Sequence, residues 1–269
     1  MSVAACVYAG TPMKKILSGA VAITLALSAG GIDSRAASAA SAASAASASS
    51  AAPAAAIATG DSEKIAQGEA LATRGSAGVT PCEQCHGTHG EGNGDVGFPR
   101  LVGQSAAYLQ RQLDAFASGS RVHPIMQPIA EAMSPAQRAA AAAYYDSLWR
   151  RAAAAPVAAA ARRASTAPNS LGATIARAGI PARDVQACAT CHGPEGIGDR
   201  ALYPALAGQH ASYLRNALAE WKSGARRTDP SGQMPRIAKA LSDAEVEALA
   251  AYFSALPPPV PPPVPPAAR

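Results

Sequence analysis

Two short stretches of this chain contain residue types whose spacing could support chemistry. The first reads CEQCH and runs from Cys82 to His86, and the second reads CATCH and runs from Cys188 to His192. The paired thiols could form two local disulfides, or all four could bind a structural zinc ion. Neither chemistry explains the histidine that directly follows each second cysteine. The pattern CxxCH is the attachment signal of c-type haem, in which two thiols bond to the porphyrin and the imidazole binds the iron. We therefore expect two covalently bound haem c groups.

Both motifs belong to a longer internal repeat. Upstream, GEALATRG (68–75) matches GATIARAG (172–179), and each ends in a glycine of the kind that closes helices. Downstream, FPRLVGQSAAYLQRQLDAF (98–116) matches YPALAGQHASYLRNALAEW (203–221), where aromatic residues eight positions apart share one helical face. No alternating strand pattern intervenes. For each half, the sequence therefore predicts a helix, a haem turn, a helix, a methionine loop and a helix. Two such halves would form an all-α fold.

The beginning of the chain predicts export. From Met13 the sequence reads MKKILSGAVAITLALSAGG, with two lysines, a short apolar run and then small residues that suit a signal peptidase. We predict a signal peptide over residues 1–39, with translation starting at Met13, and a periplasmic location. An uncleaved leader would instead anchor the protein in the membrane.

Composition divides the remainder of the 269 residues into two small packing blocks. Domains of under about 100 residues have thin cores, which a covalent cofactor would reinforce. The tail must leave the helix at Pro257, and we expect an extended, solvated spacer there. The predicted order is an Ala/Ser-rich segment (40–60), a first domain (61–150), an Ala/Arg-rich linker (151–167), a second domain (168–256) and a proline-rich tail (257–269).

The formal charge of +5 does not indicate a nucleic-acid partner. The leader alone contributes three basic residues and one acidic residue, and no basic helix with interleaved aromatic residues is present. The first domain carries a net −2, and the stretch 168–269 carries a net +2. We expect this asymmetry to orient weak encounters with redox partners.

With these motifs in this order, the chain resembles the dihaem cytochromes c of the c4 type, which consist of two class I cytochrome c domains in tandem. The resemblance covers about residues 61–256. It rests on CxxCH, the (F/Y)P-x-L-x-GQ-x-x-YL stretch, the methionine loop and a final helix that opens with Ser-Pro or Ser-Asp. It implies two small helical domains, each wrapped around a haem that is attached through Cys82 and Cys85 or through Cys188 and Cys191.

The resemblance also implies the iron ligands. The axial pairs would be His86 with Met126 and His192 with Met234, and the carbonyl groups of Pro99 and Pro204 would orient the two imidazoles. Met133 is the rival of Met126, but the repeat places it opposite Leu241, which indicates a core residue. His123 could replace Met126 on the iron, although the second half has no matching histidine, and we interpret it as a solvated or haem-edge residue. We interpret His89 and His210 as surface or capping residues.

Two filled axial positions favour an electron carrier rather than an enzyme, because no position is left for a substrate. The resemblance implies a membrane quinol-oxidising complex as electron donor and a terminal oxidase as acceptor, with weak association with the membrane surface. A second hypothesis is a haem-bearing subunit or electron acceptor of a periplasmic dehydrogenase. A third, a dihaem peroxidase, needs an open haem site, and the methionine in each half argues against it.

Overall fold

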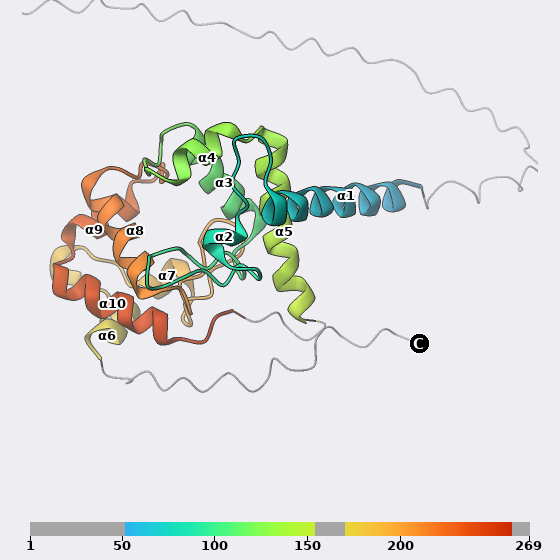
Figure 1. Ribbon diagram of the computed structural model, residues 1–269. Coiled ribbons are helices and arrows are strands. Elements are labelled where there is room, and N and C mark those ends of the chain that lie inside the picture. Colours follow the sequence, from blue (N-terminus) through green and yellow to red (C-terminus); the bar gives the residue numbers. More distant parts are fainter. Residues whose placement is uncertain (1–51, 154–169, 260–269) are drawn as a thin grey trace, which may run out of the picture. The chain divides into compact units, whose positions relative to one another are not determined.

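The computed structural model describes residues 52–153 and 170–259, and within these ranges the chain is helical (Figure 1). The described residues contain no β-strand, only isolated β-bridges, so the predicted all-α fold class is confirmed. The helices of the first half are α1 (Ala52–Arg74), α2 (Glu83–His86), α3 (Ala106–Ala117), α4 (Met126–Ala132) and α5 (Pro135–Ala153). Those of the second half are α6 (Leu171–Ala178), the 3-10 helix η1 (Pro181–Arg183), α7 (Cys188–His192), α8 (Ala211–Ser223), α9 (Gln233–Ala240) and α10 (Asp243–Ala255).

Apart from the 3-10 helix η1 of the second half, the two halves repeat one order of elements, and the main departure from the predicted order is at the methionines. We predicted a loop there, whereas Met126 and Met234 lie in the first turns of the short helices α4 and α9. The amide of Met126 donates to Nδ1 of His123 at 3.2 Å, and the amide of Met234 donates to Oδ2 of Asp229 at 2.8 Å. These side chains satisfy amides that the first turn of a helix leaves unpaired. They therefore help to explain why one helix begins at Met126 and the other begins one residue before Met234.

The first and last helices of each half cross at a glycine. Helix α1 packs on α5, and α6 packs on α10. A Cβ atom at Gly68 would lie 2.0 Å from the carbonyl oxygen of Ala140, and one at Gly172 would lie 2.1 Å from that of Ala248. No side chain fits at such distances, so each helix pair approaches to backbone contact. The upstream repeat found in the sequence thus corresponds to a repeated helix crossing.

Serine side chains mark the starts of four helices, one of which is α5, where Ser134 accepts from the amide of Gln137 at 3.2 Å. Ser105 accepts from the amide of Tyr108 at the start of α3, and Ser170 accepts from the amide of Ala173 at the start of α6. Ser242 forms a capping box with Glu245 at the start of α10. Each cap satisfies a first-turn amide and stabilises the helix by about 1 kcal/mol. These caps fix where the helices begin.

The buried cores are small and consist mainly of alanine and aromatic side chains. Tyr144 and Tyr145 in α5 pack edge to face with ring centroids 5.2 Å apart. Tyr252 and Phe253 in α10 repeat this arrangement at 5.1 Å. Such pairs add about 0.5–1.5 kcal/mol to the free energy of unfolding beyond their burial. Both halves also contribute apolar residues to the wall of one cavity.

The predicted segment boundaries can be compared with the observed ends of the helices. Helix α1 begins at Ala52, inside the segment predicted as low-complexity, because alanine is the strongest helix former. Helix α5 ends at Ala153, so it extends into the predicted linker. The signal peptide, the start at Met13 and most of the linker lie outside the described residues. Within the described ranges, no helix is long and apolar enough to cross a membrane.

The expectation of a fully solvated tail is wrong at its first residues. Pro257, Pro258 and Pro259 are half-buried, and the indole of Trp149 donates a hydrogen bond to the Pro259 carbonyl oxygen at 3.1 Å. The expectation failed because a bare stretch of proline shows no amphipathic pattern from which burial could be read. The remainder of the tail lies outside the described residues.

Candidate haem-binding site

One cavity of about 640 Å³ is lined by residues of both CxxCH motifs. Its volume lies in the range of ligand pockets, about 300–1,000 Å³. Most of its wall is apolar, and the polar groups converge from a few positions. All predicted site residues line it: Cys82, Cys85, His86, Pro99, Met126, Cys188, Cys191, His192, Pro204 and Met234. The structure therefore brings together every residue that the sequence nominated.

The four motif cysteines are free and half-buried, so none of them forms the disulfide that the spacing also allowed. Cys82 directly precedes α2, and Cys188 opens α7, which places each thiol pair on one helical turn. Burial raises the pKa of the Cys188 thiol to about 11 and raises that of Cys82 as well. Among the described residues, no group of three His, Cys, Asp or Glu side chains is placed to hold a metal ion. The donor set therefore fits thioether bonds to a porphyrin better than a zinc site.

Each motif histidine is held by a proline carbonyl group. Nδ1 of His86 donates to the Pro99 carbonyl oxygen at 3.0 Å, and Nδ1 of His192 donates to the Pro204 carbonyl oxygen at 2.9 Å. A carbonyl oxygen can only accept, so the proton lies on Nδ1 and the lone pair lies on Nε2. The second ring nitrogen is therefore the one available to an iron atom, and the hydrogen bond fixes the orientation of the ring.

Both imidazoles are in the neutral form that a metal requires. His86 is 7% exposed and His192 is 8% exposed, and burial lowers the pKa of each imidazole below its usual value. Hydrogen bonding to the proline carbonyls opposes this effect without reversing it. Deprotonation at Nε2 is thus favoured at neutral pH, as metal binding demands.

The two methionines occupy matching positions with different surroundings. Met126 is anchored through a neutral imidazole, His123, whereas Met234 is anchored through a carboxylate, Asp229. Hydrogen bonds from nearby backbone amides and Ser231 overcome burial and lower the pKa of Asp229. The amide of the second methionine is therefore held by a negatively charged side chain, whereas the amide of the first is held by an imidazole.

Met133 lies in the core, as the repeat predicted. It is 4% exposed and packs in a cluster with Val79 and Ala141, although one side of it also lines the cavity. His123 also lines the cavity, and its Nδ1 atom is engaged by the amides of Ile125 and Met126. It thus occupies the predicted position at the edge of the site.

The other two histidines lie apart from the iron-ligand positions. His89 is exposed and its Nδ1 is 3.1 Å from the Thr88 hydroxyl, as expected for a surface residue. His210 precedes α8, but its side chain does not cap that helix. Its Nε2 donates to the Glu91 carbonyl oxygen of the other half at 2.9 Å. The interpretation of His210 as a surface or capping residue is therefore wrong, because it contacts a loop that the sequence could not place beside it.

Two arginines that sequence reasoning overlooked join the halves next to the cavity. Arg121 and Arg226 line the cavity and pair through an isolated backbone bridge. Arg226 donates to the hydroxyl of Tyr108 in the first half at 3.1 Å, and Arg121 donates to that of Tyr213 in the second half at 3.2 Å. Both also donate to Oε1 of Gln112. The signal was present in the sequence, since SGSR and SGAR end at these two arginines in matching positions.

The charges of these arginines are unequally compensated. Arg121 is 3% exposed and pairs with Glu220 at 2.8 Å. Arg226 is 5% exposed, stacks on Trp221 with its guanidinium carbon 4.5 Å from the ring centroid, and has no carboxylate partner among the described residues. A buried cation of this kind needs an anion nearby. The carboxylate groups of a haem provide such anions, so this part of the cavity wall fits the group that the CxxCH motifs imply.

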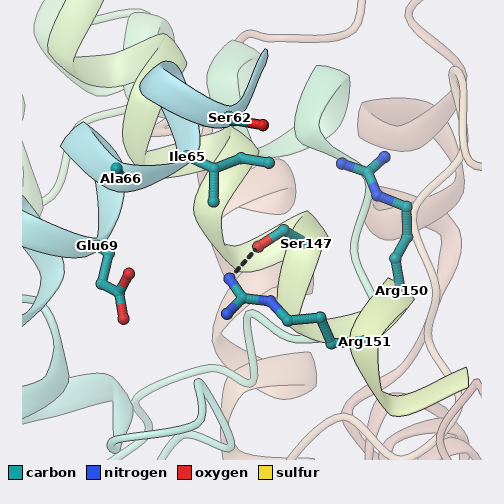
Figure 2. A pocket seen from close by; sticks show the side chains of 7 residues that line it. All are labelled: Ser62, Ile65, Ala66, Glu69, Ser147, Arg150 and Arg151. Carbon is teal, nitrogen blue, oxygen red and sulfur yellow. Dashed lines mark hydrogen bonds between the residues drawn. The ribbon is translucent and has the colours of Figure 1, made fainter. Parts of the chain in front are cut away.

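A second, shallower pocket of about 510 Å³ lies between α1 and α5 (Figure 2). Arg151 donates to the Ser147 hydroxyl at 2.7 Å, and Arg150 pairs with Asp146 at 2.6 Å. Both cationic side chains are exposed but have partners on the same helix. The pocket contains no CxxCH or methionine residue, and we interpret it as a groove of helix packing.

The comparisons with known proteins agree with this site. A model of the cytochrome c family matches residues 65–149 and again residues 172–257. The chain therefore belongs to the cytochrome c family, with two domains in tandem. Each domain carries one CxxCH motif, so the protein binds two covalent haem c groups and is a dihaem electron-transfer protein.

Two individual relatives show which members of the cytochrome c family this chain is similar to. The chain is 42% identical over 191 residues to a thiosulfate dehydrogenase electron acceptor of Stutzerimonas stutzeri, covering 70% of this chain and 86% of that protein. It is 33% identical over 202 residues to a cytochrome c4 of Azotobacter vinelandii, covering 71% and 90% respectively. These relatives share both halves of the chain, and the resemblance to c4-type cytochromes is confirmed.

Solved structures show the same fold. Reduced cytochrome c4 from Pseudomonas stutzeri matches with a TM-score of 0.55 and 27% identity, over 71% of this chain and 97% of that chain. A thiosulfate dehydrogenase from Marichromatium purpuratum matches with a TM-score of 0.62 and 39% identity. This second match covers 72% of our chain but spans only 40% of the length of the dehydrogenase chain.

Proposed function

We propose that this protein is a periplasmic dihaem electron carrier that accepts electrons from a dehydrogenase acting on thiosulfate. The observation that carries the proposal is the 42% identity, over 86% of its length, to a protein named as the electron acceptor of such an enzyme. The similarity to a thiosulfate dehydrogenase structure supports it. The proposal thus favours the dehydrogenase partner over the quinol-oxidising donor that the c4 resemblance implied.

We further propose specific roles for the residues of the cavity. When bound, haem supplies an iron centre that accepts and releases one electron. Cys82 and Cys85 would attach the first haem, and His86 and Met126 would bind its iron. The proton on Nδ1 of His86 stays on the ring and is donated in a hydrogen bond to the Pro99 carbonyl oxygen, which would direct Nε2 to the metal. The corresponding residues of the second half are Cys188, Cys191, His192, Met234 and Pro204.

These roles favour electron transfer without bond formation to a substrate. With a methionine sulfur and an imidazole both bound, the iron would have no vacant position at which peroxide could bind. The domain limits of 61–150 and 168–256 remain part of the proposal, as does cleavage of a signal peptide over residues 1–39. A terminal oxidase is the proposed acceptor, with weak association with the membrane surface.

The donor can be tested with purified components. The oxidised holoprotein is mixed with a thiosulfate dehydrogenase, and haem reduction is followed in the visible spectrum after thiosulfate is added. We expect reduction that needs both the enzyme and thiosulfate, and whose rate saturates with carrier concentration. Reduction by a purified quinol-oxidising complex, with none by the dehydrogenase, would contradict the proposed donor and favour the respiratory one.

A peroxidase assay tests the assignment as a carrier. The protein is assayed with hydrogen peroxide when fully oxidised and when half reduced. We expect negligible turnover in both states because Met126 and Met234 would occupy the iron positions that peroxide needs. Rapid turnover by the half-reduced protein would reject the carrier function, whichever donor proves correct.

A further inference from the structure

The last described residues of the chain leave the second domain in an extended conformation. Helix α10 ends at Ala255, and Leu256 has φ −70° and ψ 146°. These angles are those of the polyproline II helix, with φ near −75° and ψ near +145°. Pro257 cannot continue the α-helix because it lacks an amide hydrogen. The chain therefore enters its proline-rich segment already in the conformation that aromatic grooves recognise.

Two equivalent glycines leave room for this segment. Gly103 and Gly208 occupy the same position in the repeated FPRLVG and YPALAG stretches. A Cβ atom at Gly208 would lie 2.7 Å from Cα of Pro258, and one at Gly103 would lie 3.0 Å from Cγ of Pro259. Pro258 thus packs against the backbone of the second domain at Gly208, and Pro259 packs against the backbone of the first domain at Gly103. The segment crosses the junction between the two domains.

Trp149 completes the contact from the first domain. Its indole nitrogen donates to the Pro259 carbonyl oxygen at 3.1 Å, and the guanidinium carbon of Arg200 lies 3.6 Å from the centroid of its ring. Arg200 also forms an ion pair with the buried Asp146. In the repeat, Trp149 takes the position of Pro257, because α5 continues where α10 stops. The first domain alone therefore has this aromatic platform.

We propose that Trp149, Gly103 and Gly208 form a proline-binding surface at the domain junction, and that its occupant is the chain's own segment Pro257–Pro259. We call the contact between this surface and this segment the clasp. Trp149, Gly103 and Gly208 do not line the cavity, so the clasp acts on the junction between the domains and not on the haem ligands. An intramolecular contact benefits from an effective concentration of about millimolar, so three prolines can suffice. The proposal does not depend on which partner donates electrons.

Two truncated proteins test the clasp. One chain ends at Pro259 and keeps the clasp, and the other ends at Leu256 and lacks it. In the reduced, diamagnetic protein, the indole N–H signal of Trp149 is assigned by comparison with a Trp149→Phe variant. We expect this signal to be unchanged in the longer chain, and to shift and exchange faster with water in the shorter one. An unchanged signal in the chain that ends at Leu256 would overturn the proposal.

A steric cycle gives a second measurement. Gly208→Ala is introduced into both truncated chains, and the melting temperature is measured by calorimetry. The backbone at Gly208 has φ +66°, so strain is common to both chains, but the overlap with Pro258 exists only in the longer one. We expect the substitution to lower the melting temperature by at least about 3 °C more in the chain that ends at Pro259. Equal losses in the two chains would contradict the contact.

Two experiments test which segment occupies the surface: sedimentation, which reports the molecular mass, and binding of a synthetic peptide. A chain that ends at Pro259 should sediment as a monomer, and a dimer that dissociates on truncation to Leu256 would refute occupation within one chain. A synthetic peptide of residues 256–269 should bind the chain that ends at Leu256, although weakly, because the contact is then no longer intramolecular. The same peptide should not bind its Trp149→Ala variant, and equal binding to both would refute the role of the indole.

Discussion

The closest backbone contact of the first domain makes a quantitative prediction. In Gly68→Ala, the new methyl group would lie 2.0 Å from the Ala140 carbonyl oxygen and 2.7 Å from Cβ of Tyr144. Ordinary contacts of this kind are more than an ångström longer, so α1 and α5 must separate. Gly172→Ala creates the same conflict with α10 in the second domain, at 2.1 Å from the Ala248 carbonyl oxygen.

The expected loss follows from two opposing effects. Overpacking of a close contact costs about 1–3 kcal/mol, and a conflict with backbone atoms lies at the upper end of that range. Alanine returns up to about 1 kcal/mol through its higher helix propensity. We therefore expect Gly68→Ala to lower the free energy of unfolding by about 2 kcal/mol. The change should affect the first haem site before the second.

Guanidinium unfolding of the ferric protein measures both effects. The weak band at the red end of the visible spectrum reports methionine sulfur on ferric iron. In Gly68→Ala, half of its intensity should be lost at a lower denaturant concentration than in the unsubstituted protein. Gly60→Ala is the matched control, because it lies in the same helix and a Cβ atom there meets nothing within 4 Å. This control should be stabilised by about 0.5–1 kcal/mol. Equal unfolding midpoints for the two variants would refute the tight crossing.

Three further substitutions test the charges of the structure. Glu220→Gln removes the carboxylate that compensates the buried Arg121, and should lower the free energy of unfolding by about 2–3 kcal/mol; an unchanged denaturation midpoint would count against the ion pair. The Arg183 hydrogen bond and the capping box lower the pKa of Glu245 to about 2, so its contribution to stability is present above about pH 4.5 and is lost as the pH falls toward 2. Acid unfolding of Glu245→Gln should be less dependent on pH in that window, and an unaltered profile would contradict the pKa. Asp229→Asn removes a negative charge beside the second methionine helix, and should raise one of the two reduction potentials while leaving the other in place; spectroelectrochemistry would reject the effect if neither potential rose.

Local patterns in the sequence predicted most of the fold. CxxCH, the glycine-ended helices and the spacing of the aromatic residues each act within about twenty residues, so periodicity and motif chemistry suffice to place them. The positions of Met126 and Met234 against the cavity followed from the repeat. The short helices that contain these methionines in their first turns were missed, since their start depends on side-chain acceptors in the preceding loops.

Contacts between the two domains could not be predicted from local patterns in the sequence. The reciprocal pairing of Arg121 and Arg226, the contact of His210 and the docking of Pro259 on Trp149 all join residues about a hundred positions apart. Such contacts depend on how two folded domains meet, which no periodicity encodes. The matching arginines in SGSR and SGAR show that comparing the repeats position by position would have identified the pair as candidates.

The measurement that tests the central claim most directly is a redox titration of the purified holoprotein, followed across the visible spectrum. We predict uptake of two electrons per chain in two one-electron steps, with the red methionine band of the ferric protein at the strength of two haems. This result follows from two covalent haems with His86 and Met126, and His192 and Met234, as axial pairs. Uptake of one electron, or a methionine band at the strength of one haem, would contradict the account.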